Sequence, residues 1–220
     1  MTLLAIDTCE ACCSVALLGA DGQSYVISEK IGRGHAERLL PMIGELLTEA
    51  GLAYADLTRI AVTTGPGTFT GLRIGLSVAR GLALSLAVPC IGVPALMVLG
   101  AQAKGCGVPV HTAIKGRGGQ IFYQAFDNSV EDDVPFALCE AVNIDAVDAE
   151  GLFSAAPGAL TGSGACLIDG REETLDDAVN PVILAQLAQK LRPEDFAPEP
   201  LYLRAADAVK AKTILNIAAD

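Results

Sequence analysis

The chain has 220 residues, 51% of them hydrophobic and 19% charged, a composition that excludes a disordered or collagen-like protein. A chain of this length can bury a sizeable core without disulfide or metal staples. Its 15 basic and 26 acidic residues give a net charge of −11, which opposes direct binding to RNA or to an anionic membrane. We therefore expect any contact with a nucleic acid to need a basic partner.

The cysteines and the start of the chain indicate a cytoplasmic protein. The seven cysteines are an odd number and lie mostly within apolar stretches, which is typical of free thiols in a reducing compartment. The first residues lack a basic segment, and Asp7 and Glu10 interrupt any signal-peptide core. Residues 81–103 are uncharged and long enough to cross a membrane, but Pro89 and Pro94 predict a helix, a short strand and a second helix instead.

The first half of the chain predicts a mixed sheet with helices. Apolar runs at residues 3–8, 13–18 and 24–29, with turn residues before the third, predict an antiparallel meander. From residue 34 the apolar period changes to that of a helix, which ends at Gly51. The core stripe expected for this helix consists of Ala36, Leu39, Leu40, Ile43, Leu47 and Ala50. The expected elements that follow are a strand at 59–64, a glycine-rich loop at 65–70, a helix at 71–88, a strand at 90–93 and a helix at 94–104.

The second half is more acidic and predicts fewer helices. Strands at residues 108–114 and 120–126 should form a hairpin, followed by an acidic loop at 127–133. Short apolar runs at 141–147 and 158–161 precede one helix at 181–191, capped by Asn180, and a surface segment at 192–200. The expected division is an N-terminal lobe at residues 1–104, a smaller C-terminal lobe at 105–204 and an extension at 205–220. Alternating strands and helices indicate an α/β fold.

A glycine-rich loop between a strand and a helix is a candidate anion site, because free backbone N–H groups gather at such a place. The site would include Gly65 and Gly67 of the loop and Asp7 and Thr8 at the end of the first strand. A second glycine turn at residues 161–165 would face them. The alternative is a tight structural turn in which Thr70 caps the following helix, because the loop has neither a Walker nor a dinucleotide spacing.

The helix at residues 71–88 sorts its residues into two unlike faces. One face carries small residues at every fourth position and is suited to close packing. The opposite face and an apolar edge of the preceding helix together form more apolar surface than a domain with few layers can bury. We therefore expect a partner protein to cover them. The alternative is that a third helix or the C-terminal segment covers them. The expected interface residues are Leu39, Met42, Leu46, Arg73, Leu76, Arg80 and Leu84.

The candidates for catalysis and metal binding are few. His35 would need a histidine at position 39 to bind zinc on one helical face, but that residue is Leu39, so no metal site is expected. His111 lies in an expected strand and is interpreted as a structural residue. Cys9 and Cys12 flank a strand turn, so we interpret them as buried small hydrophobes. No nucleophile motif accompanies the two histidines, and hydrolase chemistry is not supported.

Four stretches of the sequence resemble the bacterial TsaB (YeaZ) family, which belongs to the actin, hexokinase and heat-shock ATPase superfamily. The stretches are LLAIDTCEACCSVAL at the start, HAERLLPMI from His35, TTGPGTFTGLRIGLSVARGLA from Thr63, and PLYLR from Pro200. The long third stretch is the most specific of them. The resemblance implies a two-lobed actin/hexokinase-like (ribonuclease-H-like) α/β fold with mixed sheets and a reduced second lobe.

The resemblance also implies a function without catalysis. Members of the family are expected to bind the catalytic subunit TsaD through their first two helices and to activate it in the formation of threonylcarbamoyladenosine in tRNA. The ATPase TsaE would join the complex, and the isolated chain would form a homodimer. No cofactor of its own is expected, while a nucleotide at the interface of the complex is an open alternative. The alternative function is that of a small-molecule kinase or ATPase of the same superfamily, built around Asp7 and Thr8.

Overall fold

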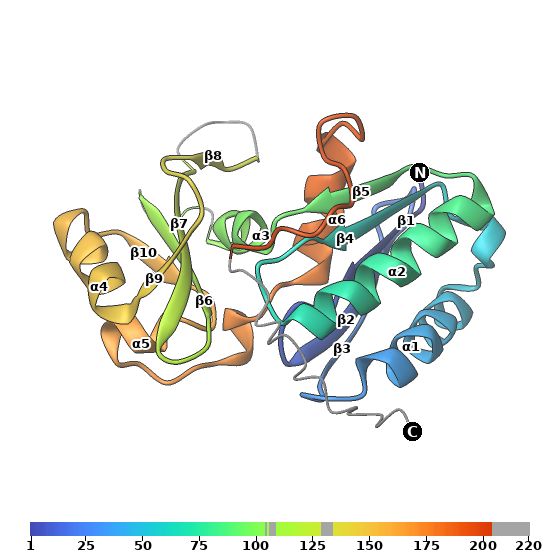
Figure 1. Cartoon of the computed structure of the whole chain (residues 1–220). Coiled ribbons are helices and arrows are strands. Elements are labelled where there is room, and N and C mark those ends of the chain that lie inside the picture. Colours follow the sequence, from blue (N-terminus) through green and yellow to red (C-terminus); the bar gives the residue numbers. More distant parts are fainter. Residues whose placement is uncertain (104, 106–108, 129–133, 204–220) are drawn as a thin grey trace, which may run out of the picture.

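The computed structural model describes residues 1–103, 105, 109–128 and 134–203, and in it two β-sheets stand side by side with helices packed on them (Figure 1). The predicted α/β class with mixed sheets is confirmed. All strands of the first sheet precede residue 104 and all strands of the second follow it. The expected extension at 205–220 lies outside the described residues.

The first sheet has five strands in the order β3-β2-β1-β4-β5. Strands β1 to β3 form the predicted antiparallel meander, and β4 and β5 continue the sheet parallel to β1. β1 and β2 are buried along their whole length, whereas the edge strand β3 alternates between exposed and half-buried residues. The bounds are Leu3–Asp7 (β1), Cys12–Leu18 (β2), Ser24–Lys30 (β3), Arg59–Thr63 (β4) and Cys90–Val93 (β5).

Three helices cover the two faces of this sheet. Helices α1 (His35–Ala50) and α2 (Phe69–Leu86) lie on one face, and α6 (Pro181–Lys190) lies on the other (Figure 1). Successive side chains of β1 point to opposite faces of the sheet: Leu4 packs in the cluster with α1 and α2, while Leu3 packs in the cluster with α6. A helix from the end of the chain thus completes the core of the first sheet.

The ends of the helices follow from local capping. Gly51 ends α1 in the left-handed conformation with φ of 67°, as the sequence predicts. Asn180 caps α6 through the backbone N–H of Val182, also as predicted. The prediction that Thr70 caps α2 is wrong, because the cap is Thr68, whose Oγ1 accepts the Gly71 N–H at 3.3 Å. The Thr68 N–H donates to the carbonyl of Cys9 at 2.7 Å, which holds Thr68 extended, so that the helix begins at the next residue.

The stretch that has the composition of a membrane span is divided as expected. After α2 the chain forms β5 and then α3 (Ala95–Gln102), so residues 81–103 are a helix, a strand and a helix. Within the described residues α2 has the length and hydropathy of a spanning helix, a property it shares with core helices, and a third of that window is buried in the protein. It packs on the sheet through Leu72 and Ala79 and carries exposed arginines.

The second sheet has the order β10-β6-β7-β8, with β9 also paired to β7. The predicted hairpin is confirmed in β6 and β7, although residue 108, its expected start, lies outside the described residues. Helices α4 and α5 were not predicted from the sequence. Residues 146–155 of α4 show no helical apolar period, and Val147 in it is 77% exposed. The bounds are Val110–Lys115 (β6), Gln120–Asp127 (β7), Phe136–Ala137 (β8), Val142–Asp145 (β9), Ala159–Thr161 (β10), Ala146–Ala155 (α4) and Cys166–Asp169 (α5), with 3-10 turns at Tyr54–Asp56 and Leu175–Asp177.

Residues 196–203 form a C-terminal strap over the ends of β4 and β5. The N–H of Gly92 donates to the carbonyl of Phe196 at 2.9 Å, and the N–H of Leu201 donates to the carbonyl of Thr64 at 2.8 Å. A Cβ on Gly92 would lie 2.4 Å from the carbonyl oxygen of Ala197, so the strap can approach the strand only at a glycine. The segment predicted to lie on the surface is therefore tied to the first sheet.

His111 is the structural residue that the sequence predicts. Its Nε2 lies 2.7 Å from the carbonyl oxygen of Ala156 and must carry the proton, so its Nδ1 accepts the hydroxyl of Tyr123 at 2.5 Å. Burial lowers the pKa of His111 and thereby favours this neutral form. The ring joins both strands of the hairpin to the end of α4.

Tyr123→Phe should therefore lower the free energy of unfolding by about 1–2 kcal/mol, because it leaves a buried Nδ1 without its donor. Urea unfolding followed by circular dichroism measures this difference. Tyr25→Phe is the matched control, because the Tyr25 hydroxyl bonds Gln23 at the surface. Equal stability of the two variants would show that the contact of His111 with Tyr123 contributes nothing.

Candidate functional site

Helices α1 and α2 carry the surface on which the sequence analysis placed a partner. On α2, Arg73, Arg80 and Leu84 point to solvent, and Leu84 is 85% exposed, more than any other large hydrophobic residue among those described. On α1, Leu40 is 48% exposed although the sequence analysis assigned it to the core stripe. Both helices therefore leave apolar surface outside the core.

Four of the expected interface residues are not on that surface. Leu39, Met42 and Leu46 are fully buried and Leu76 is 5% exposed, so the expectation that they lie outward is wrong. The core stripe expected for α1 was correct for Leu39, Ile43 and Leu47, but Met42 and Leu46 also belong to it, at three- and four-residue spacing against the sheet. Leu76 follows Leu72 by four residues and precedes Ala79 by three, which puts it in the buried stripe of α2.

The outward surface combines apolar side chains with glycines. A Cβ on Gly44 or on Gly81 would meet nothing within 4 Å, so another helix can approach both helices closely there. Arg38 of α1 binds Glu29 of β3, which places Leu40 and Gly44 on the flank of α1 that faces α2. We call this surface the docking face; it consists of Leu40, Gly44, Arg73, Ser77, Arg80, Gly81 and Leu84.

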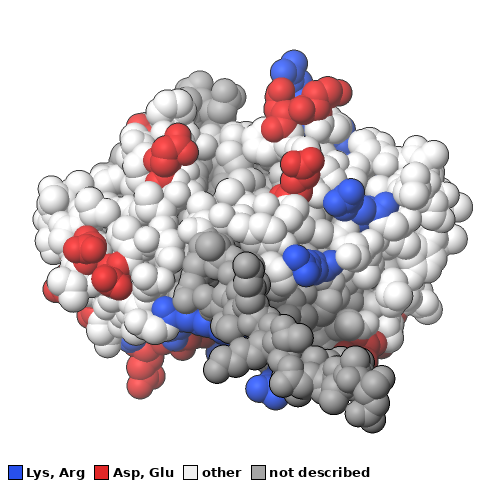
Figure 2. Space-filling view, in the orientation of Figure 1, with Lys and Arg blue, Asp and Glu red and all other residues white. Residues whose placement is uncertain are grey.

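The charges on the two helices differ in sign. All charged residues of α2 are arginines, whereas α1 carries Glu37, Glu45 and Glu49. Figure 2 shows basic groups on an otherwise largely uncharged surface over α2. Arg38 is engaged by both Glu29 and Glu45, and its hydrogen bonds hold the pKa of these two carboxyls below their usual range. The acids of α1 are thus partly neutralised within the chain.

The candidate anion site at the end of β1 is closed by the chain's own contacts. Asp7 and Thr8 are buried; Asp7 accepts the Thr63 hydroxyl at 2.6 Å and the Cys9 N–H at 3.2 Å. Burial raises the pKa of the Asp7 carboxyl, and these hydrogen bonds partly oppose the shift. The Thr8 hydroxyl donates to the carbonyl of Gly71 at 2.8 Å.

The glycines of the loop are explained by how closely the chain packs on them. A Cβ on Gly67 would lie 2.3 Å from the carbonyl oxygen of Cys9, and one on Gly71 would lie 2.0 Å from that of Thr8. Gly65 has φ of 98°, which favours glycine. The backbone of the β1–β2 turn thus fills the loop that was a candidate for binding an anion.

A polar cluster connects the two sheets next to this turn. The hydroxyl of Ser163 donates to the carboxylate of Glu10 and accepts the N–H of Lys115 at 3.1 Å. Glu173 binds Lys30 of β3 at 3.0 Å and Lys115 of β6 at 2.5 Å. The sequence analysis expected the turn at 161–165 to face Asp7 and Thr8, and the structure places its Ser163 on Glu10, two residues beyond Thr8. We call these five residues the inter-sheet clasp.

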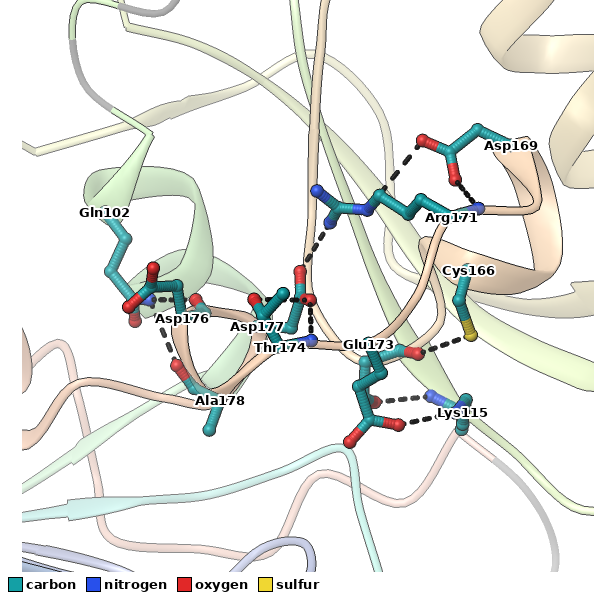
Figure 3. A network of polar contacts seen from close by, with 11 residues as sticks. Gln102, Lys115, Cys166, Asp169, Arg171, Glu173, Thr174, Asp176, Asp177 and Ala178 are labelled. Atoms are coloured by element: carbon teal, nitrogen blue, oxygen red, sulfur yellow. Dashed lines mark hydrogen bonds and ion pairs between the residues drawn. The ribbon is translucent and has the colours of Figure 1, made fainter.

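The segment that leads from the second sheet to α6 is held by one side chain of α3. Figure 3 shows Gln102 in contact with the backbone of this segment, where its Nε2 donates to the carbonyl of Ala178 at 3.1 Å. Its Oε1 accepts the N–H of Asn180 at 2.8 Å. Asp177, which is buried, accepts the N–H of Thr174 at 2.8 Å and binds Arg171. These contacts fix the connection between the sheets.

Glu10 gives the clasp a pH dependence. Burial raises the pKa of Glu10 from 4.5 to about 7, with the nearby Asp7 and Glu173 carboxylates adding to the shift and the Ser163 hydroxyl and Lys115 opposing it. The folded chain therefore binds this proton more tightly than the unfolded chain does. The resulting stabilisation is complete below pH 4.5 and is lost as the pH rises through about 7.

Glu10→Gln should remove that dependence while keeping a hydrogen-bonding group opposite Ser163. We expect the variant to gain melting temperature relative to the wild type as the pH is raised from 5 to 8. Thermal melts of both proteins across this range measure the difference in melting temperature, in which contributions common to both proteins cancel. A difference that stays constant over these pH values would contradict the assignment.

Residues 24–145, more than half of the chain, match the family model described as TsaD: tRNA N6-adenosine threonylcarbamoyltransferase. The chain is 42% identical over 135 residues to the tRNA threonylcarbamoyladenosine biosynthesis protein TsaB of Escherichia coli (strain K12), which covers 59% of the chain and 58% of that relative. It is 36% identical over 141 residues to the protein of the same name from Bacillus subtilis (strain 168), covering 61% and 60%.

A solved structure extends the likeness to almost the whole fold. YeaZ from Pseudomonas aeruginosa matches with a TM-score of 0.75 and 28% identity, over 92% of this chain and 100% of that one. The chain belongs to the TsaB (YeaZ) family. The predicted α/β fold with mixed sheets is confirmed with it, whereas the likeness to actin and hexokinase stays a prediction.

Both curated relatives of this TsaB-family chain are named for the biosynthesis of threonylcarbamoyladenosine in tRNA. The chain spans about three-fifths of the length of the curated relatives it matches. The matched region at 24–145 includes α1 and α2, so the helices of the docking face lie within the part that resembles the transferase family. In this TsaB-family chain His35 is buried, with Nε2 3.2 Å from the carbonyl oxygen of Cys12, and Leu39 stands four residues on.

Several residues of interest in this TsaB-family chain carried no local signal in the sequence. Phe69 and Tyr202 stack with ring centroids 5.4 Å apart, although 133 positions separate them (202 − 69). Gln102 and Glu173 likewise act on segments far away in the chain. Leu40 was wrongly placed in the core stripe of α1. Phe69 could have been found from the sequence, because it lies four residues before Arg73 on α2.

Proposed function

We propose that this chain is a non-catalytic accessory subunit that binds the catalytic subunit TsaD through helices α1 and α2 and activates it in the formation of threonylcarbamoyladenosine in tRNA. The observation that carries the proposal is the exposure of Leu84 and Leu40 beside Gly44 and Gly81 on two neighbouring helices. Exposed apolar side chains beside glycines form a surface on which a helix of another protein can pack closely. The likeness of residues 24–145 to the TsaD family supports a pairing of related folds through equivalent helices.

The corrected interface is smaller than the sequence suggested. Arg73, Arg80 and Leu84 keep their role as contact residues, with the arginines steering and orienting the partner. Leu39, Met42, Leu46 and Leu76 support the face from beneath, because they hold the two helices on the sheet. A homodimer of the isolated chain would use the same face, and the ATPase TsaE would join the complex with TsaD.

The charge of the chain supports an indirect role towards tRNA. With a net charge of −11 the chain repels a polyanion, so the partner would supply the basic surface for tRNA. The described cysteines are all free thiols, which supports work in the cytoplasm. We propose no cofactor for the chain alone.

The alternative of a phosphate-transferring enzyme finds less support. Its candidate residues Asp7 and Thr8 are buried and bonded within the chain, and the loop glycines are in contact with backbone atoms. Calorimetry with magnesium and ATP on the isolated chain separates the two functions. Tight binding with turnover would favour the enzyme, and no heat of binding is expected for the accessory subunit.

The direct test of the proposed function is reconstitution. Purified TsaD from the same organism, with its substrates, TsaE and tRNA, should form modified tRNA much faster when this chain is added than without it. Mass spectrometry of the digested tRNA measures threonylcarbamoyladenosine. An unchanged rate would contradict an activating role.

A further inference from the structure

Three side chains form an ordered cluster at the N-terminal end of α2, next to the C-terminal strap. The guanidinium carbon of Arg73 lies 3.7 Å from the centroid of the Phe69 ring. The Nε of Arg73 donates to the hydroxyl of Tyr202 at 3.3 Å, and the rings of Phe69 and Tyr202 are 5.4 Å apart at 31°. Phe69 is 41% and Tyr202 44% exposed, so the cluster lies at the surface.

Among the described residues, the contacts of Arg73 involve the face and the Nε of its guanidinium, and they fix its plane. Stacking on Phe69 and the hydrogen bond to Tyr202 engage the ring-facing side and the Nε. Within the described part of the chain, no hydrogen bond or ion pair engages the two terminal nitrogens of Arg73. An arginine held in this way has lost much of its side-chain entropy before a ligand binds. The N–H groups on its two terminal nitrogens match the two oxygens of a carboxylate.

The strap has backbone anchors besides this cluster. Backbone hydrogen bonds from Leu201 to Thr64 and from Gly92 to Phe196 already tie the strap to the first sheet. The side chains of Phe69, Arg73 and Tyr202 are therefore not the only anchors of the strap, and they order a cation on the docking face.

We propose that Phe69, Arg73 and Tyr202 form a preorganised receptor for a carboxylate of the protein that covers α2. The inference rests on the docking function proposed above and adds to it the chemistry of one contact. A carboxylate is favoured over a phosphate of RNA because the chain carries a net charge of −11. Arg73 acts as the contact residue, while Phe69 and Tyr202 are positioning residues.

Calorimetric titration of TsaD with variants of the full chain tests the receptor. Arg73→Lys keeps the charge but loses stacking and the two-pronged geometry, and we expect binding at least about 10-fold weaker. Tyr202→Phe keeps the ring but loses the orienting bond, and we expect binding about 2- to 5-fold weaker. Arg192→Lys is the matched control at an exposed arginine beyond α6, with affinity within about 2-fold of the wild type.

The salt dependence and the stability of the variants complete the test. The affinity of the wild type should fall between about 50 and 300 mM salt, and that of Arg73→Gln should fall much less. Melting temperatures of all variants should stay within about 3 °C of the wild type. A loss of stability in Arg73→Lys without a loss of affinity would make the cluster a strap anchor only and overturn the receptor.

Two further outcomes separate this inference from the proposed function. If the wild type binds TsaD and Arg73→Lys binds equally well, the receptor is wrong while the docking face stands. If the wild type does not bind TsaD at all, both are wrong. Binding of the isolated wild-type chain to tRNA that Arg73→Lys abolishes would identify a phosphate as the ligand and overturn the carboxylate receptor.

Discussion

A chain carrying Leu84→Asp should fold as the wild type does and bind TsaD at least about 100-fold more weakly. Leu84 is 85% exposed in the isolated chain, so a carboxylate there stays hydrated until a partner covers it. The cost of removing that charge from water then falls on the complex alone. Calorimetric titration measures the affinity, and a thermal melt within about 3 °C of the wild type shows that the fold is intact.

Two other substitutions make this result specific. Val147→Asp introduces the same charge at a side chain 77% exposed on α4 and should leave the affinity within about 2-fold. Leu76→Asp, at a residue that the sequence placed in the interface, would instead bury a charge in the core and unfold the chain, because Leu76 is 5% exposed. Equal affinity of Leu84→Asp and the wild type would remove Leu84 from any interface with TsaD.

Gly71→Ala should be among the most destabilising single substitutions in the chain. The new Cβ would lie 2.0 Å from the carbonyl oxygen of Thr8 and 2.6 Å from the hydroxyl oxygen of Thr68, so α2 must move away from the β1–β2 turn. We expect a loss of about 2–3 kcal/mol in the free energy of unfolding and a melting temperature about 5–10 °C lower. Urea and thermal unfolding both measure it.

The matched control is a glycine in the same helix. Gly81→Ala places a Cβ in open space and should raise stability by about 0.5–1 kcal/mol through helix propensity. If Gly71→Ala were as stable as Gly81→Ala, close packing would not explain the glycine at the start of α2, and the loop would again be a candidate for ligand binding.

The sequence predicted best where local chemistry decides the structure. The turn residues between β2 and β3, Gly51 after α1 and Asn180 before α6 act through their immediate neighbours, and the corresponding elements lie within one or two residues of the predicted bounds. Strand β5 agrees with its prediction at both ends, since prolines bracket it closely.

The docking face shows where local pattern was insufficient. On α1, the apolar residues are numerous enough for more than one stripe, and only contact with the sheet selects the stripe that buries Met42 and Leu46 and exposes Leu40. On α2, Arg73 and Arg80 marked the outward side correctly, but Leu76 lies close to the border between the faces. In both helices, the burial of large side chains against the sheet determines which residues face outward.

Long-range contacts account for most of the rest. The inter-sheet clasp joins Glu10 to Ser163, and the strap brings Tyr202 to Arg73, over more than a hundred intervening residues in each case. Neither pairing has a periodicity or a spacing that a single sequence reveals. Helix α4 was missed because its apolar residues are spread around the helix instead of lying on one side.

The mass of a mixture of this chain with TsaD, measured by light scattering after size exclusion, tests the central claim most directly. We predict a new species whose mass includes both proteins and which disappears when the chain carries Leu84→Asp. Two separate peaks at the masses found for each wild-type protein alone would show that the exposed side of α1 and α2 has no such partner.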